Sequence, residues 1–134
     1  MTLREGKMAQ EIKVFIIEDD IGTRNYFAEV IELFFGARVS CTFASGIEDA
    51  IATFERLLNN GIDIIFVDAC LNSTRPNSMP LVRHIANFYQ GPILAMSGNK
   101  NFIYPLLEAG CSHHCAKDKF FNVIDEFLRR LPES

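Results

Sequence analysis

Four acidic residues directly follow two hydrophobic stretches of the sequence. Glu18, Asp19 and Asp20 come after residues 12–17, and Asp68 ends a second stretch, I-I-F-V-D. Adjacent carboxylates repel one another, and at 4 Å with an effective dielectric constant near 20 one pair costs about 4 kcal/mol. A solvated turn tolerates this repulsion, and so does a cation site, so the three neighbouring acids alone favour neither interpretation. Taken alone, Asp68 is more often a turn residue or a helix N-cap than a reactive group.

A hydroxyl group and an ammonium group, those of Ser97 and Lys117, follow two further hydrophobic stretches. Together with the acids they form a set that suits transfer of a phosphoryl group to a carboxylate. Gathered carboxylates bind Mg²⁺, which also takes water and phosphate oxygens and neutralises charge on the phosphoryl group. Asp68 is then the candidate nucleophile, which would form an acyl phosphate. The lysine offers a compact positive charge to phosphoryl oxygens, and the serine offers a hydrogen-bond donor.

The elements that must position these residues follow from the hydrophobic pattern. Short apolar runs rich in β-branched and aromatic residues predict strands that are buried on both faces of a parallel sheet. A run that alternates between apolar and polar residues predicts instead an edge strand. The predicted strands are residues 12–17, 38–43, 64–67, 93–96 and 111–116, and the alternating one is 38–43.

Apolar residues at helical spacing predict a helix after each strand. Gly36 and Gly110 are placed to end the first and fourth helices. Ser45, with Glu48 three residues later, resembles a capping box before the second helix. Pro105 falls in the first turns of the fourth helix or breaks it. The predicted helices are residues 22–35, 47–58, 81–89, 101–109 and 120–131.

Five strands that alternate with five helices through short loops predict a single α/β domain with a doubly wound parallel sheet and helices on both faces. In such a sheet the carboxyl ends of all strands lie along one rim, where open α/β sheets bind their ligands. The acids after the first strand, Asp68, Ser97 and Lys117 would all meet there. Their joint occurrence makes Asp68 a candidate reactive group rather than a turn residue.

Composition narrows the function further. The chain has 134 residues, of which 49% are hydrophobic and 22% are charged, which suits one folded domain. Its net charge of −4 argues against broad binding to nucleic acid or to a membrane surface. No apolar run approaches the roughly 20 residues of a membrane span, and the N-terminus lacks the apolar core of a signal peptide. We therefore expect a cytoplasmic protein.

The four cysteines are expected to be reduced, packed thiols in that compartment. Cys111 and Cys115 enclose two histidines, but this spacing leaves the usual short-spaced zinc ligand pairs incomplete or crowded on one strand. A metal site there is the less favoured interpretation.

The chain resembles the receiver domain of bacterial two-component response regulators over residues 11–132. Residues 1–10 show no periodicity and are expected to be a loose lead-in to this domain. The matching motifs are V-F-I-I-E-D-D, I-D-I-I-F-V-D, I-L-A-M-S-G and E-A-G-C-S-H-H-C-A-K. Each motif is weak alone, but their order and spacing make the resemblance specific. It implies a flavodoxin-like sheet with strand order 2-1-3-4-5.

The resemblance also implies a function and a set of site residues. Asp68 would take a phosphoryl group from a histidine kinase or a histidine phosphotransfer protein. Asp19, Asp68 and the backbone carbonyl of Cys70 would bind Mg²⁺ directly, and Glu18 would bind it through water. Ser97 and Lys117 would sense the phosphoryl group. The chain would then be a signalling switch rather than an enzyme, since it would catalyse at most its own phosphorylation and dephosphorylation.

In such a switch, phosphorylation would change the surface formed by the fourth helix, the fifth strand and the fifth helix. This change would alter binding to a downstream protein. The same surface is also a candidate interface for a homodimer. His114 stands where the family carries an aromatic residue that turns inward with the hydroxyl group. It is either a half-exposed strand residue or a working switch. Because an unperturbed histidine changes charge near pH 6.5, a working switch here would couple to pH.

The sequence departs from the family pattern at three places. Asp118 replaces the proline that usually follows the lysine, and a cis bond without proline costs about 2.5–4 kcal/mol. We therefore expect a trans bond and a reshaped loop, and this leaves open whether Lys117 is displaced. The loop after the third strand is longer than usual and lacks the common proline after Leu71. Cys70 stands where side chains influence dephosphorylation, which leaves the phosphoryl lifetime open.

These departures keep two alternatives open. The first is a protein-interaction module of the same fold that works without phosphorylation. The second is a phosphatase or another small enzyme that uses the acidic rim, which is less favoured because no residue suggests itself as a base for turnover.

Overall fold

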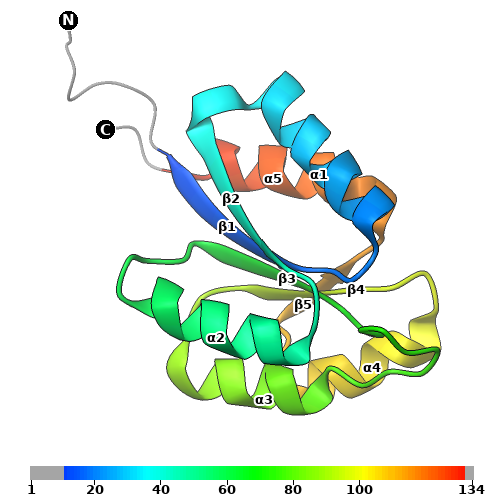
Figure 1. Ribbon diagram of the computed structural model, residues 1–134. Helices are drawn as coiled ribbons and strands as arrows, with labels where there is room; N and C mark the ends of the chain where they lie inside the picture. The colour runs from blue at the N-terminus through cyan, green and yellow to red at the C-terminus, as the bar shows by residue number, and fades with distance from the viewer. Residues whose placement is uncertain (1–10, 132–134) are drawn as a thin grey trace, which may run out of the picture.

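Five parallel strands and five α-helices alternate along residues 11–131, the part of the chain that the computed structural model describes (Figure 1). The strands are β1 (Ile12–Ile17), β2 (Val39–Ala44), β3 (Ile64–Asp68), β4 (Ile93–Met96) and β5 (His113–Cys115). They form one sheet in the order β2-β1-β3-β4-β5, and each neighbouring pair is parallel. The predicted α/β class and the strand order 2-1-3-4-5 are confirmed. The lead-in predicted at residues 1–10 and the end of the domain predicted at residue 132 lie outside the described residues.

The helices lie in two layers, one on each face of the sheet. They are α1 (Ile21–Phe34), α2 (Ile47–Leu58), α3 (Met79–Phe88), α4 (Lys100–Ala109) and α5 (Phe120–Arg129). The layer of α1 and α5 covers one face, and the layer of α2, α3 and α4 covers the other (Figure 1). Within residues 11–131, no helix combines the length and the apolar character that crossing a membrane requires.

The central strand β3 is buried along its whole length. Ile65 and Val67 pack into the core beneath α2, α3 and α4, while Ile64 and Phe66 pack into the core beneath α1 and α5. Burying an aliphatic or aromatic side chain of this size contributes about 1.5–3 kcal/mol. The apolar residues on both faces therefore hold the strand firmly, and its last residue, Asp68, lies at the carboxyl end of the sheet.

Several predicted boundaries differ from the structure by one or two residues. The capping box predicted at Ser45 is wrong, because Gly46 is the N-cap of α2 and the Asp49 carboxylate accepts a hydrogen bond from the Ser45 N–H at 3.0 Å. Helix α3 begins at Met79 rather than at Leu81, since a proline such as Pro80 is tolerated in a first turn, where no N–H donor is needed.

Strand β5 is shorter than the predicted residues 111–116. The Cys111 N–H still bonds to the Leu106 carbonyl at the end of α4, and a short 3₁₀ helix, η3 (Lys117–Lys119), follows the strand. Gly110 ends α4 as predicted, with a φ angle of 139°. A Cβ atom on Gly110 would lie only 2.8 Å from the Cβ of Ala86 in α3, so this turn brings α4 close to its neighbour.

Candidate functional site

The backbone at the end of β1 holds Glu18 in a fixed position. Its side chain is fully buried, and its N–H donates to the Ala44 carbonyl of β2 at 2.9 Å. Its own carbonyl accepts a hydrogen bond from the Arg24 guanidinium of α1 at 2.9 Å. The Glu18 Oε2 atom accepts a bond from the Asp20 N–H at 3.1 Å. A buried carboxylate needs such partners, because burying an unpaired charge is costly.

The Asp20 carboxylate does not belong to the acidic cluster of Glu18, Asp19 and Asp68, although Asp20 follows Asp19 directly. It is the N-cap of α1, where its Oδ2 atom accepts hydrogen bonds from the Thr23 hydroxyl at 2.7 Å and the Thr23 N–H at 2.8 Å. These two bonds, the hydroxyl foremost, lower the pKa of Asp20. The three adjacent acids are therefore divided: two of them belong to the site, and the third caps a helix.

Asp68 lies beside Glu18 and Asp19, as the strand ends predicted. One oxygen atom from each of the three carboxylates lies within 4.8 Å of the others. The Asp68 side chain is only 11% exposed. Burial first, and then the charge of Glu18, raise the pKa of Asp68 to about 7, although the charge of Lys117 opposes them.

Asp19 lies beside Asp68, and its surroundings favour the ionised form. Its Oδ2 atom accepts a hydrogen bond from the Asn72 N–H in the loop after β3, at 2.9 Å. Burial raises the pKa of Asp19, but the Asn72 N–H and the hydrogen bonds with neighbouring carboxyl groups outweigh it, so the pKa is lowered overall. The environment therefore lowers the pKa of Asp19 and raises that of Asp68, so Asp19 loses its proton at a lower pH than Asp68 does.

Lys117 reaches both buried acids from the end of β5. Its Nζ atom lies 2.7 Å from Glu18 Oε1 in an ion pair, and it donates to Asp68 Oδ2 at 3.4 Å. Burial lowers the pKa of Lys117, but the two carboxylates raise it more. Lys117 therefore contacts both acids although Asp118 follows it, so it is not displaced away from them. The peptide bond between Lys117 and Asp118 is trans, as predicted, since residues 11–131 contain no cis peptide bond.

Ser97 follows β4 at the same rim, directly after Met96, which pairs with Asp68 in the sheet register. Its Oγ atom accepts a hydrogen bond from the Asn99 N–H at 3.1 Å. The hydroxyl hydrogen is thus left to donate to another group. The serine is therefore at the correct end of the sheet, but its present partner is its own loop.

His114 and Cys70 lie near the site in different ways. His114 is exposed on the edge strand β5 and pairs with Ala95 in the register. It borders a hollow of about 180 Å³ against α4, lined also by Lys100, Ile103, Tyr104 and Leu107. The Cys70 thiol is partly buried, and burial, then the charges of Asp68 and Asp19, raise its pKa, so it stays a thiol.

The cluster of Glu18, Asp19 and Asp68 fits a hard divalent cation. Its donors are carboxylate oxygens, which Mg²⁺ and Ca²⁺ prefer over nitrogen or sulfur. Within residues 11–131 it is the one group of acidic, histidine or cysteine side chains close enough to share an ion. Cys111 and Cys115 form no such group there and are buried, which agrees with packed thiols.

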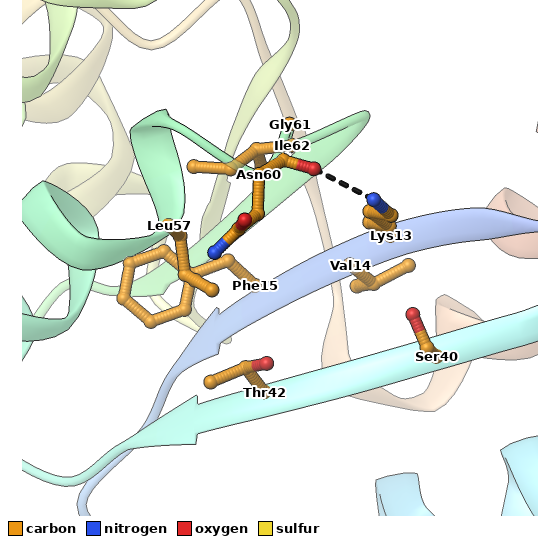
Figure 2. A pocket seen from close by; sticks show the side chains of 9 residues that line it. All are labelled: Lys13, Val14, Phe15, Ser40, Thr42, Leu57, Asn60, Gly61 and Ile62. Carbon is orange, nitrogen blue, oxygen red and sulfur yellow. Dashed lines mark hydrogen bonds between the residues drawn. The ribbon is translucent and has the colours of Figure 1, made fainter.

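Another hollow, of about 160 Å³, lies toward the amino ends of β1 and β3 (Figure 2). Ser40 and Thr42 of the edge strand border it, and the Lys13 ammonium donates to the Asn60 carbonyl at 2.6 Å across one side. No carboxylate or thiol lines it, and its one charged group is already bonded. The acidic rim is therefore the better candidate for chemistry.

Two residues that hold the site were not identified from the sequence. Arg24 bonds to the backbone carbonyl of Glu18, and Asn72 bonds through its backbone N–H to Asp19, which is distant in the sequence. Neither residue belongs to a local motif. Asp20 and Thr23 do carry a local signal, since an aspartate three residues before a threonine at a helix start is typical of an N-cap.

Comparison with known proteins identifies the fold. No protein-family model matches the chain, and no curated protein matches it in sequence. A two-component response regulator from Clostridium difficile is similar in structure, with a TM-score of 0.71 and 22% identity over 90% of this chain and 98% of that chain. A CheY-like receiver domain protein from Methanospirillum hungatei JF-1 has a TM-score of 0.70 and 13% identity, covering 90% and 95% of the two chains.

The phosphorylated cyanobacterial phytochrome response regulator RcpA is also similar, with a TM-score of 0.68 and 16% identity over 90% of this chain and 95% of that chain. The three structures come from distant organisms and share the same architecture with the chain described here. The chain thus has the fold of response regulator receiver domains, as the resemblance implied.

Proposed function

We propose that this chain is a phospho-accepting receiver in two-component signalling, with Asp68 as the acceptor. The observation that carries the proposal is the position of Asp68, buried at the end of β3 beside Glu18 and Asp19, with the Lys117 ammonium 3.4 Å from its Oδ2 atom. A nucleophilic carboxylate, two further acids and a cationic side chain are the groups that phosphoryl transfer to aspartate requires. The receiver fold supports the same conclusion.

In the proposed reaction an Asp68 oxygen attacks the phosphorus atom of a phosphohistidine. The new O–P bond forms as the N–P bond breaks, and the electron pair of that bond returns to the donor imidazole. Asp19, Asp68 and the Cys70 carbonyl would hold Mg²⁺, and Glu18 would hold it through water. The ion would supply positive charge that neutralises the phosphoryl oxygens.

Lys117 and Ser97 would respond to the new group. Lys117 already contacts Asp68, so its ammonium can move onto a phosphoryl oxygen with little displacement. The Ser97 hydroxyl can donate to another oxygen once it turns away from Asn99. Phosphorylation adds about −1.5 to −2 charges, which gives both groups a strong new partner.

The surface formed by α4, β5 and α5 would carry the signal to a downstream protein, or to a second copy of the chain. His114 lies on β5 beside the hollow against α4, and Tyr104 on α4 is 61% exposed. An inward turn of Ser97 would give His114 room to follow. To shift the inactive and active conformations from a ratio of 1:99 to 99:1, the phosphoryl group would have to stabilise one conformation over the other by about 5.5 kcal/mol.

The proposed partners are a histidine kinase or histidine phosphotransfer protein as donor and a protein as receiver of the signal. We propose no direct role in binding nucleic acid or membranes, since the net charge is −4. We propose that the chain acts in the cytoplasm, because the proposed donors would present their phosphohistidine there. The chain would act as a switch rather than as an enzyme with turnover.

Incubation with acetyl phosphate tests the proposal directly. We expect intact-mass spectrometry to show the gain of one phosphoryl group with Mg²⁺ and none with a chelator, and peptide mapping to place it on Asp68. The Asp68→Asn variant should show no gain. Asp20→Asn is the matched control, because it removes a neighbouring acid but keeps a residue that caps helices well. Absence of phosphorylation in the unmodified protein, or its mapping to another residue, would contradict the proposal.

The second candidate is a protein-interaction module that works without phosphorylation. One observation favours it: the Lys117 ammonium lies nearer to Glu18 than to Asp68, so the protein already neutralises much of its own acidic site. This module would bind its partner equally well as the unmodified chain and as Asp68→Asn, with or without acetyl phosphate. A phosphoryl-dependent change in partner affinity would exclude it.

A further inference from the structure

Asn72 has an unusual backbone conformation in the loop between β3 and α3. Its φ angle is 55°, and it is the one non-glycine residue with a positive φ among residues 11–131. Residues with a Cβ atom rarely adopt this left-handed region, although asparagine tolerates it better than most. A residue held there needs contacts that compensate for the strain.

Those contacts join Asn72 to two other loops at the rim of the sheet. Its N–H donates to Asp19 Oδ2 at 2.9 Å, and its side-chain amide donates to the Ser45 carbonyl at 3.2 Å. The first contact reaches the turn after β1, and the second reaches the loop after β2. The backbone N–H thus bonds to the carboxylate while, with φ in the left-handed region, the side-chain amide anchors the residue to the loop after β2.

The rest of the loop supports this arrangement without touching the acids. The Asn77 side chain donates to the Leu71 carbonyl at 2.8 Å and accepts from the Leu71 N–H at 2.7 Å. The backbone N–H and carbonyl of Leu71, the residue before Asn72, are therefore both held by the Asn77 side chain. Asn77 makes no hydrogen bond to the carboxylates, so it serves as a structural comparison for Asn72.

We infer that Asn72 is a positioning residue that holds the Asp19 carboxylate in place for a divalent cation through its backbone N–H. The inference rests on the proposed function, because it concerns the same cation site. A carboxylate held by a neighbouring donor loses less freedom when it binds an ion, and removal of such outer partners typically weakens metal binding about 10- to 100-fold. The asparagine side chain matters because it stabilises the left-handed backbone.

Three substitutions at Asn72 separate the backbone N–H from the side chain. Asn72→Pro removes the N–H and fixes φ near −65°. Asn72→Val keeps the N–H, but a β-branched residue strongly disfavours a positive φ, so the N–H turns away from Asp19. Asn72→Gly keeps the N–H and adopts the positive φ without strain. Asn77→Ala loosens the loop without removing a partner of Asp19.

Mg²⁺ binding, measured by isothermal titration calorimetry on the full chain, tests the inference. We expect Asn72→Pro and Asn72→Val to bind Mg²⁺ about tenfold more weakly than the unmodified chain, and Asn72→Gly to recover nearly all of the affinity. Asn77→Ala should lower the melting temperature, but it should weaken Mg²⁺ binding much less than Asn72→Val does. Unchanged affinity in folded Asn72→Val, or equal losses in Asn72→Gly and Asn72→Val, would overturn the inference.

A second measurement works without metal and distinguishes this inference from the proposed function. In the metal-free protein, a hydrogen bond to a carboxylate should shift the Asn72 amide proton downfield in the NMR spectrum. Asp19→Asn should weaken that shift, whereas Asp20→Asn should leave it unchanged. If the shift is present and the chain binds no Mg²⁺, the proposed function fails while the contact stands. If the shift is absent, the positioning role fails whatever the metal does.

Discussion

The Lys117 ammonium lies 2.7 Å from Glu18 Oε1, so one basic side chain neutralises a carboxylate that is fully buried. This contact forms although Asp118, rather than proline, follows the lysine. The 3₁₀ helix η3 that begins at Lys117 leads directly into α5 and takes up the change of direction after β5. The position of the lysine is therefore set by its acidic partners and not by a proline-containing loop.

Removing the Lys117 charge should destabilise the protein. Lys117→Met would leave Glu18 charged and buried without its partner, and breaking a buried pair from one side costs about 3–5 kcal/mol, which we reduce to about 2 kcal/mol because Lys117 is partly exposed. Chemical denaturation at pH 7 measures the loss. Lys119→Met, an exposed lysine in the same short helix, is the control and should have little effect. Equal losses in the two variants would show that the ion pair contributes nothing specific.

Stability should fall as the pH rises from about 4 to about 7. The pKa of Asp68 is raised from 3.8 to about 7, so between these values the folded state binds more protons than the unfolded state. The free energy of unfolding therefore decreases with pH through this window and levels off above it. Asp68→Asn removes this dependence and should be more stable than the unmodified chain at pH 8 without metal, by on the order of 2 kcal/mol. Denaturation curves at pH 5 and pH 8 check this prediction. If the difference in unfolding free energy between Asp68→Asn and the unmodified chain is the same at both pH values, the prediction is wrong.

Mg²⁺ affinity should increase with pH up to about 7, because the ion and a proton compete for Asp68. Calorimetric titrations between pH 5.5 and 8 measure the trend. Asp19→Asn should bind Mg²⁺ more weakly at every pH, since it loses a charged ligand of the cluster. Asp20→Asn should behave like the unmodified chain, because that carboxylate caps α1. A loss of affinity in Asp20→Asn equal to that in Asp19→Asn would place the ion elsewhere.

His114→Phe tests whether β5 gives the switch a pH dependence. If His114 takes part in the switch, we expect the NMR shifts that phosphorylation induces along α4 and β5 to differ between pH 6 and pH 8 in the unmodified chain, because histidine is the side-chain type that most often responds to pH in this range. The phenylalanine variant should show the same shifts at both values. If the two proteins respond alike at each pH, His114 has no such role and is simply an exposed strand residue.

Gly110→Ala should destabilise the packing of α4 against α3. The glycine has a φ angle of 139°, and a new Cβ would lie 2.8 Å from the Cβ of Ala86, closer than two carbon atoms pack. Strain and overpacking of this kind cost about 1–3 kcal/mol. Gly98→Ala is the control, because a Cβ there meets no atom within 4 Å. Thermal unfolding of the two variants compares them, and similar melting temperatures would show that the helices move apart at little cost.

The sequence predicted the elements with strong patterns and the rim at which they end. The run from Ile12 to Ile17 is a strand with the predicted bounds, because five of its six residues are apolar and buried. The fifth strand was overestimated because His113 and His114 carry no apolar signal to mark where pairing begins. Cys111 lies in the turn after α4, whereas Cys115 is the last residue of the strand and pairs with Met96.

The contacts that adjust the site were beyond prediction for a physical reason. Asn72 and Asp19 are 53 positions apart, and their hydrogen bond uses a backbone N–H that any residue but proline possesses. Arg24 likewise bonds to a backbone carbonyl, that of Glu18. In each contact one partner is a backbone group, so no pair of residue types in the sequence marks it. Asp19 belongs to the acidic cluster and Asp20 caps α1, and this difference depends on where α1 begins. Helix boundaries are poorly determined by local sequence.

The burial of β3 also limits how any phosphoryl donor can reach Asp68. From Ile64 to Asp68 every residue of this strand is enclosed by helices above and below the sheet and by neighbouring strands on both sides. A reagent therefore has a single direction of approach, end-on along the strand axis. For the proposed phosphoryl transfer, a small donor would meet this condition easily, whereas a protein donor would have to present its imidazole on a convex feature that projects into the rim.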